Sequence, residues 1–397
     1  MTITTADLLP DRPDVSTRTT FLLAVACGLI VANIYAPQPL AGPIAASLGL
    51  SPHATGLVVT VIQIGFGAGL LLLVPLGDLF ETRRLTLGLI GLATLGLLGA
   101  ALSPRAAPFL IASLFIGLGS VAAQVLVPYA AHLAPEAVRG RVVGNVMSGL
   151  MLGVMLARPV ASFIAQLSSW HVMFLISAGA MMVLAAVLSR ALPPRQPAAK
   201  LRYGQLLASM AQLAMTTPIL QRRALYHACL FAAYSLFWTT TPLLLAGPEF
   251  QLSQGGIALV ALAGVAGAVA SPIAGRVADR GWTRPATALS MLAVAVAFLM
   301  THLAAQGSPM ALGLLVAAAI LLDFGVSANL TLGQRAIFAL DAEVRSRLNG
   351  LYMATFFVGG AIGSAIGGWA FAQGGWTLAS SLGFALPVAA LVYFATE

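Results

Sequence analysis

Charged residues are scarce in this chain. They make up 8% of its 397 residues, whereas soluble domains carry about 25%. Hydrophobic residues account for 59%, and the mean hydropathy is +0.94. A soluble fold of this length could not cover so much apolar surface, but a lipid bilayer accepts it directly. The scarcity of charge therefore excludes a soluble globular protein and indicates an integral membrane protein.

Cysteine is nearly absent, and the usual motifs of catalysis are missing. Cys27 and Cys229 are too few for a disulfide framework, and we interpret both as small core residues. The sequence contains no Ser/His/Asp grouping, no metal-ligand cluster and no GxxxxGK phosphate loop, and its short loops leave no room for a catalytic domain. We therefore expect neither an enzyme nor an ATPase, and we expect no metal and no cofactor.

The apolar residues form twelve runs that can each cross a bilayer, which takes about 20 residues. Short breaks rich in Gly, Pro and charge separate them. The first residues are polar and acidic, unlike the basic start of a cleavable signal peptide. The expected spans are 20–45, 54–76, 85–103, 107–132, 140–166, 170–192, 223–247, 255–275, 285–305, 308–335, 346–372 and 376–396.

The net charge of +8 would suit a nucleic-acid partner. The positions of the basic residues decide between that interpretation and one based on membrane topology. Seventeen of the 20 Lys and Arg fall in the first tail and in alternate loops after spans 2, 4, 6, 8 and 10. This asymmetry follows the positive-inside rule and predicts both termini in the cytoplasm. The basic charge therefore reflects topology in a cell (inner) membrane. We expect a lipid bilayer and no nucleic acid as the partner, and a monomer.

The chain contains an internal repeat. Asp78 and Arg83 recur as Asp279 and Arg284 at an offset of 201 positions. Six further residues recur at an offset of 206: Arg139, Arg141, Gly144, Met147, Gly153 and Trp170 match Arg345, Arg347, Gly350, Met353, Gly359 and Trp376. The repeat predicts an all-α membrane protein with two pseudo-symmetric six-helix bundles, 20–192 and 223–397, after a cytoplasmic tail, 1–19.

The linker 193–222 begins with a proline break and a basic stretch. Leu206, Leu207, Met210 and Leu213 then follow near helical spacing. This pattern favours an amphipathic helix on the cytoplasmic leaflet, and a plain tether is the alternative.

Two loop segments resemble the signature of the major facilitator superfamily, in which Gly and three residues precede Asp-Arg and basic residues close the turn. Gly275 to Arg284 fits this signature well, whereas the copy from Gly77 to Arg84 departs from it at Val74, Leu79 and Glu81. The stretches 33–40 and 334–349 are also similar to the drug/metabolite efflux branch, whose members are proton antiporters. The resemblance covers 20–396 and implies the two-bundle fold of that superfamily.

The resemblance implies two gating contacts at the cytoplasmic side. Asp78 is expected near Arg345 and Arg347, and Asp279 near Arg139 and Arg141, so that both contacts break when this side opens. An acid at the start of a helix is also favoured by the helix dipole. The alternative is that the arginines serve topology alone. The latch candidates are Asp78, Arg83, Arg84, Arg139, Arg141, Asp279, Arg280, Arg284, Arg345 and Arg347.

Asp323 and Arg158 are the charges that lie deep inside predicted spans. A charge at the bilayer centre costs about 2.5–3.5 kcal/mol on insertion scales, so each should face a cavity or a partner. Ser327, Thr331 and Gln334 continue from Asp323 along one helical face. Three roles are open for Asp323: a proton carrier, since burial disfavours its charged form, a structural partner of Arg158, or a contact to substrate. The position where many drug/proton antiporters have an Arg holds Ser113 here, and Arg158 is the candidate to replace it.

The remaining cavity candidates are aromatic and amide side chains. They are Asn33, Tyr35, Gln38, Gln124, Tyr226, Tyr234 and Trp238, with Ser327 below Asp323. An apolar and aromatic cavity with few polar anchors suits hydrophobic or amphipathic compounds; packing within the bundle is the alternative for each residue. The glycines of spans 2 and 11 are expected where these two helices slide past each other.

Together these features predict a secondary transporter that works by alternating access. Proton-coupled efflux of small hydrophobic or amphipathic compounds or metabolites is the first interpretation, and proton symport that imports a small metabolite is the alternative. A channel is disfavoured because two unlike halves with one buried acid supply no ring of charges.

Overall fold

The computed structural model describes residues 17–195, 202–340 and 344–397, and within these ranges it contains helices and no strands. The predicted tail 1–19 lies mostly outside the described residues, and so do linker residues 196–201. The elements of the first half are α1 (Thr17–Tyr35), η2 (Gln38–Leu40), α2 (Ala41–Ser47), η3 (Pro52–Ala54), α3 (Leu57–Leu72), η4 (Val74–Asp78), α4 (Thr82–Leu102), α5 (Ala106–Ser120), α6 (Ala122–Leu133), η5 (Glu136–Val138), α7 (Arg139–Leu167) and α8 (Trp170–Ala191). Those that follow are α9 (Tyr203–Thr216), α10 (Pro218–Ala246), α11 (Gln254–Ala261), η6 (Leu262–Ala266), α12 (Gly267–Asp279), α13 (Thr283–Met300), α14 (Pro309–Phe338) and α15 (Arg345–Phe394).

Ten stretches of the described residues are long and apolar enough to cross a membrane. One of them, α15, contains 50 residues and is interrupted at Gly374 and Gly375. A continuous helix of that length would extend about 75 Å, more than twice the bilayer core of about 30 Å. Gly375 has φ 60°, a left-handed conformation that glycine adopts readily. The α15 segment therefore folds as two spans.

The remaining span is broken rather than absent. Residues 254–279 form α11, η6 and α12 in succession, so no single helix there has the length of a span. Pro272 lies inside α12, and proline removes a backbone hydrogen bond from a helix. With this segment and the two parts of α15, the chain has the twelve predicted spans. The prediction of an all-α membrane fold is confirmed.

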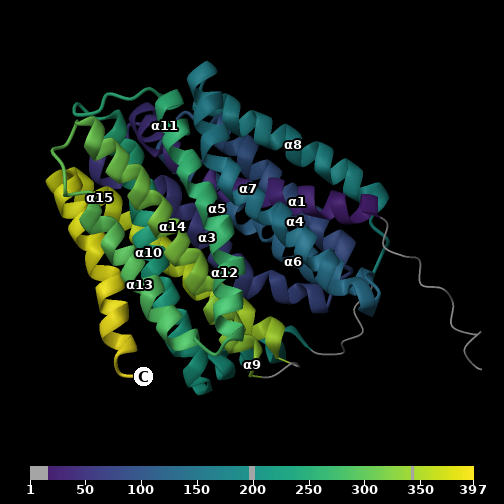
Figure 1. The fold of residues 1–397 in the computed structure, drawn as a ribbon. Helices are drawn as coiled ribbons and strands as arrows, with labels where there is room; N and C mark the ends of the chain where they lie inside the picture. The colour runs from purple at the N-terminus through teal and green to yellow at the C-terminus, as the bar shows by residue number, and fades with distance from the viewer. Residues whose placement is uncertain (1–16, 196–201, 341–343) are drawn as a thin grey trace, which may run out of the picture.

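The sequence repeat is also a repeat of position in the structure. Arg139 begins α7 and Arg345 begins α15, while Trp170 begins α8 and Trp376 directly follows the break at Gly375. Gly153 packs against Gly28 of α1, and its counterpart Gly359 packs against Ala228 of α10. The same helix–helix contact is therefore made once in each half. Figure 1 shows α1, α4, α6 and α8 on one side and α10, α13, α14 and α15 on the other.

The glycines of spans 2 and 11 divide between two kinds of contact. Gly368 packs on Gly56 across the two halves, as the sequence predicts. Gly65 instead packs on α5, and Gly363 packs on Ala232 of α10, each inside its own half. The prediction was too general because glycine also permits close approach between neighbouring helices of one bundle.

The helix α9 connects the two halves. Its Leu206 and Met210 are buried, and the Tyr203 hydroxyl donates to the Leu72 carbonyl oxygen at 2.8 Å. Arg347, at the start of α15, donates to the Ser209 hydroxyl. Figure 1 shows α9 at the end of the molecule where the C-terminus lies. This is also the end that carries the loops rich in arginine, which we call the basic face (the loops at 79–84, 134–141 and 276–284, with residues 339–340 and 344–347).

Candidate functional site

Arg158 is held in the interior between the two halves. It is 1% exposed, and its Nε donates to Oε1 of Gln38 at 2.6 Å. One terminal nitrogen, Nη2, donates to the hydroxyl of Tyr234. The guanidinium also lies over the rings of Tyr35, Tyr234 and Trp238, at 5.3, 5.1 and 4.5 Å from the ring centroids. Such cation–π contacts are stronger where water is excluded, so the charge of Arg158 is well compensated on this side.

Local sequence explains why these groups converge. Pro37 and Pro39 interrupt the first span, so α1 ends at Tyr35 and the short helix η2 directs Gln38 toward α7. Tyr234 and Trp238 are four residues apart on α10, which places them on one helical face. The site therefore draws Tyr35, Gln38 and Arg158 from the first half and Tyr234 and Trp238 from the second.

Asp323 reaches the same site from α14. Its side chain is 3% exposed, and its Oδ2 atom has no hydrogen-bond partner among the described residues. The indole Nε1 of Trp238 likewise has no partner there. A Cβ atom built on Gly264 would lie 3.0 Å from Asp323 Oδ2 and 3.5 Å from Arg158 Nη1, so these two atoms are at most 6.5 Å apart.

Asp323 and Arg158 nevertheless do not form an ion pair. Among the described residues, ion pairs within 4.0 Å join Arg84 to Glu81, Arg223 to Glu397 and Arg335 to Asp279. A buried charge pair normally requires close contact to offset desolvation. The two charged groups therefore lie beside Gly264 with more than 4.0 Å between their nitrogen and oxygen atoms, and we call this separation the gap.

Six of the predicted site residues come together here: Tyr35, Gln38, Arg158, Tyr234, Trp238 and Asp323. Three others lie elsewhere. Asn33 lines a small cavity with residues of α7 and α8, Gln124 lines a cavity at the basic face, and the Tyr226 hydroxyl donates to Glu397. Ser327 lies on α14 four residues after Asp323, and its carbonyl accepts from Thr331.

Two features of the interior were not found from the sequence. Gly264 borders both charges, and no sequence signal distinguishes it from the other 39 glycines. His227 is fully buried on α10, with Asn329 Nδ2 3.4 Å from its Nδ1 and the rings of Tyr352 and Phe356 stacked on it. A histidine inside a span was a signal that could have been read.

At the basic face, the latch candidates form ion pairs and hydrogen bonds with partners other than the expected ones. Asp279 pairs with Arg335 at 2.5 Å, and Arg139 donates to the Ala131 carbonyl oxygen at 3.1 Å. The expected contact of Asp279 with Arg139 and Arg141 is not formed in this structure. Asp78 and Arg347 border one cavity, without an ion pair between them.

The other latch candidates are also bound locally or exposed. Arg83 donates to carbonyl oxygens at the end of α8 and just after it, Arg84 pairs with Glu81, and Arg345 donates to the Phe338 carbonyl oxygen. Arg284 lies over the Phe394 ring, and Arg141 and Arg280 are exposed.

On the opposite face, the two halves are joined directly. Gly255 at the start of α11 donates its N–H to Oε1 of Gln166 at the end of α7, at 3.0 Å. The hydroxyls of Thr60 and Ser364 are hydrogen-bonded at 2.7 Å. In contrast, a Cβ on Gly140 or Gly144, at the other end of α7, would meet nothing within 4 Å among the described residues. The halves are therefore in direct contact at the face opposite the basic loops, and space is open beside Gly140 and Gly144 at the basic face.

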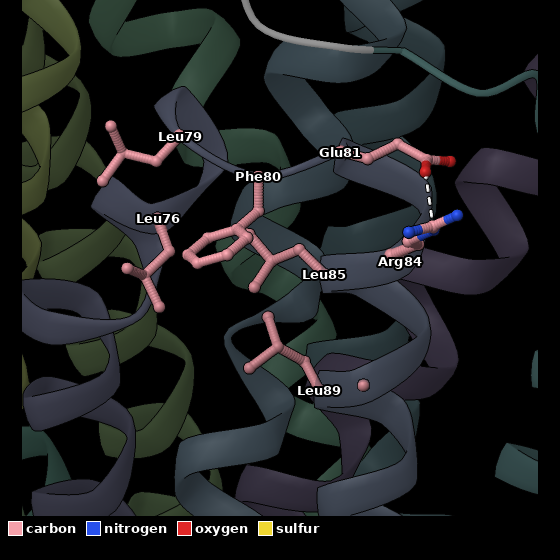
Figure 2. Close-up of a pocket in the computed structure, with 8 residues that line it drawn as sticks. Leu76, Leu79, Phe80, Glu81, Arg84, Leu85 and Leu89 are labelled. Carbon is pink, nitrogen blue, oxygen red and sulfur yellow. Dashed lines mark ion pairs between the residues drawn. The ribbon is translucent and has the colours of Figure 1, made fainter. Parts of the chain in front are cut away.

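A groove at the end of α4 is separate from this site. Figure 2 shows it between Leu76, Phe80, Leu85 and Leu89, with the Glu81–Arg84 ion pair beside it. None of the six central residues lines it.

The sequence profile of the Major Facilitator Superfamily matches residues 21–312 and 224–397. The chain belongs to the Major Facilitator Superfamily. The uncharacterized transporter YgaY of Escherichia coli O157:H7 is 38% identical over 355 residues, which is 89% of each chain. "Probable transporter SCO4007" of Streptomyces coelicolor is 33% identical over 363 residues, 89% of this chain and 82% of that one.

Solved structures of the superfamily share the fold. The crystal structure of a mutant of the nucleoside transporter NupG has a TM-score of 0.78 at 14% identity, covering 95% of this chain and 99% of that one. The inward-open xylose transporter XylE from E. coli has a TM-score of 0.67 at 14% identity, covering 95% of each chain. As a member of this superfamily, the chain is a multi-pass membrane protein and a secondary transporter of small molecules by alternating access. It is a transporter and not an enzyme.

Proposed function

We propose that this transporter exports small hydrophobic or amphipathic compounds by proton antiport. The observation that carries the proposal is the buried carboxyl of Asp323. Its Oδ2 makes no hydrogen bond of normal geometry among the described residues and lies at most 6.5 Å from Arg158 Nη1. The efflux direction is supported by the similarity of segments 33–40 and 334–349 to the drug/metabolite efflux branch.

Asp323 is the proposed proton carrier. A carboxylate in this position costs free energy unless it is paired or protonated, and Arg158 does not pair with it in this structure. One proton that moves across a potential of 100 mV supplies about 2.3 kcal/mol. Protonation removes the charge of Asp323, whereas Arg158 keeps its charge because a guanidinium stays protonated in proteins. Arg158 is the proposed electrostatic partner in coupling.

The aromatic groups around Arg158 are the proposed substrate surface. Tyr35, Tyr234 and Trp238 come from both halves and are at most 6% exposed. Rings on both halves allow a substrate to be gripped in either state when the halves rock. Gln124 lies on the proposed path between this site and the basic face.

The gate at the basic face is proposed to work by exchange of partners. Asp279 binds Arg335 when the opposite face is closed, as here, and would bind Arg139 or Arg141 in the other state. Asp78 and Arg347 border one cavity and are the proposed second contact. The seventeen basic residues on the tail and alternate loops support cytoplasmic termini in an inner membrane. The bundles are proposed to comprise 20–192 and 223–397, within a monomer.

Reconstitution in liposomes with an imposed proton gradient tests the proposal. A panel of lipophilic cations, sugars, amino acids and uncharged aromatic compounds is scored for movement against or with the gradient. Proton antiport predicts that at least one amphipathic compound moves opposite to protons. Accumulation in the same direction as protons would instead support import by symport, and gradient-independent equilibration of every compound would contradict coupling.

A further inference from the structure

The gap between Asp323 and Arg158 has a defined chemistry. The Cβ position on Gly264 is 3.0 Å from Asp323 Oδ2, 3.5 Å from Arg158 Nη1 and 3.5 Å from a ring carbon of Trp238. Since the two charged atoms are at most 6.5 Å apart, a ligand group that touches one of them also reaches the other. A ligand in this gap is therefore recognised by both charges at once.

The groups around the gap offer donors and one acceptor. Asp323 Oδ2 can accept and Trp238 Nε1 can donate, and neither makes a hydrogen bond of normal geometry among the described residues. Trp238 and Tyr234 both lie close enough to Asp323 to interact with its carboxyl. The Nε and Nη2 nitrogens of Arg158 are bound to Gln38 and Tyr234, so Nη1 is the nitrogen that faces the gap. A hydroxyl donates one hydrogen bond and accepts two, and an amide also does both. Either group can donate to Asp323 and accept from Arg158 and Trp238.

We infer that the site takes uncharged aromatic alcohols or amides, and that Arg158 determines this specificity by excluding cations from Asp323. The inference rests on the proposed function because it names the substrate class of the same site. The aromatic part follows from the rings of Tyr35, Tyr234 and Trp238, which together surround the guanidinium and offer flat apolar surface for offset or edge-to-face packing.

A charged ligand is attracted by one of the two charges and repelled by the other, so the site returns little of the free energy that burying the ligand's charge costs. An ammonium at Asp323 would lie within about 6 Å of the guanidinium, and at an effective dielectric of about 20 that repulsion corresponds to roughly a hundredfold in affinity. A carboxylate at Arg158 would meet the carboxylate of Asp323 at a similar distance. An uncharged group suffers neither repulsion, and its hydrogen bonds to the two charges are charge-assisted.

Three ligands that share one ring system test the inference. Tryptophol carries a hydroxyl, tryptamine an ammonium and indole-3-acetate a carboxylate. Binding of each radiolabelled ligand to the purified full-length protein is measured by equilibrium dialysis at neutral pH. We expect tryptophol to bind at least tenfold more tightly than the other two. Failure of tryptophol to bind, or equal or tighter binding of either charged ligand, overturns the inference.

Two variants at Arg158 test whether its positive charge or its side-chain shape determines the preference for uncharged ligands. Arg158→Gln should bring the affinity for tryptamine at least tenfold closer to that for tryptophol, whereas Arg158→Lys, which keeps the positive charge, should retain the exclusion of tryptamine. An unchanged ratio of the two affinities in Arg158→Gln overturns the role of Arg158. If Arg158→Gln does not fold, the comparison of the three ligands on the native protein still decides the substrate class.

Transport assays distinguish a failure of this inference from a failure of the proposed proton antiport. Tryptophol that binds but moves without dependence on the proton gradient in liposomes would support the inference and contradict proton coupling. Proton-driven movement of tryptamine, with no movement of tryptophol, would support coupling and contradict the inference.

Discussion

Arg158 and Asp323 come from opposite halves of the transporter and face one another across Gly264 without an ion pair. Arg158 donates instead to Gln38 and Tyr234 and lies over the rings of Tyr35, Tyr234 and Trp238. Asp323 Oδ2 makes no hydrogen bond of normal geometry in the part of the chain that the structure describes. Because the halves move relative to each other during alternating access, the separation of these two residues should change during the transport cycle.

Asp323→Asn should abolish proton-driven transport and leave the folded protein intact. The amide has nearly the same volume but cannot exchange a proton, so the substrate should still exchange across the membrane without accumulation. Counterflow and gradient-driven uptake in the same liposomes measure the two activities. Glu136→Gln, the same kind of replacement at an exposed residue, is the control and should retain both. Gradient-driven transport at the normal rate in Asp323→Asn would exclude the carrier role.

Hydropathy and the repeat were sufficient to predict the twelve spans, because lipid imposes a length and a polarity on every helix. The six clustered site residues were also predicted, since a polar group inside a span is costly unless it faces a partner or a cavity. The sequence did not predict which polar residues would meet. Asn33 is two residues from Tyr35 yet lines another cavity, because the helix turns it about 200° away.

The role of Gly264 could not be predicted, since it depends on how η6 packs between α7 and α14. The hydrogen-bond and ion-pair partners of the arginines at the basic face could not be predicted either, because an exposed arginine has several acceptors within reach. The expected contact of Asp279 with Arg139 is not formed in this structure, and a single sequence does not specify which conformational state a structure shows.

Gly264→Ala should weaken substrate binding by at least tenfold without loss of fold. The added methyl group would lie 3.0 Å from Asp323 Oδ2 and 3.5 Å from Arg158 Nη1, so it occupies the place where a ligand would touch both. Binding of a transported compound to the purified protein and its melting temperature are measured together. Gly313→Ala on α14, where the methyl group meets nothing within 4 Å, is the matched control. Normal affinity in Gly264→Ala would place the substrate elsewhere.

Arg335→Gln should open the basic face less often. It removes the partner that Asp279 has in this structure and leaves the proposed partners of the other state, Arg139 and Arg141, in place. Exposed ion pairs contribute about 0.2–1 kcal/mol, so the open population should fall by up to about fivefold. A cysteine at Gly144, in a background with Cys27 and Cys229 replaced by alanine, reports the change through its rate of maleimide labelling. Glu81→Gln removes an ion pair within one loop and should leave the rate unchanged. An equal labelling rate in Arg335→Gln and the native protein would contradict the gate.

Gly117→Ala should destabilise the protein, and the reason explains why the two halves differ in charge. At the 206-residue offset, Gly117 is the counterpart of Asp323. A Cβ on Gly117 would lie 2.8 Å from Phe66 N and closer still to Ile62 O, so α5 and α3 would have to separate. Overpacking of this kind costs about 1–3 kcal/mol, which should lower the melting temperature in detergent. Gly91→Ala, where the new methyl group meets nothing within 4 Å, should leave it unchanged or raise it. If both variants melt like the native protein, close packing does not explain the absence of a side chain at position 117. If only Gly117→Ala melts early, the first half has no room for an acid where the second half has Asp323.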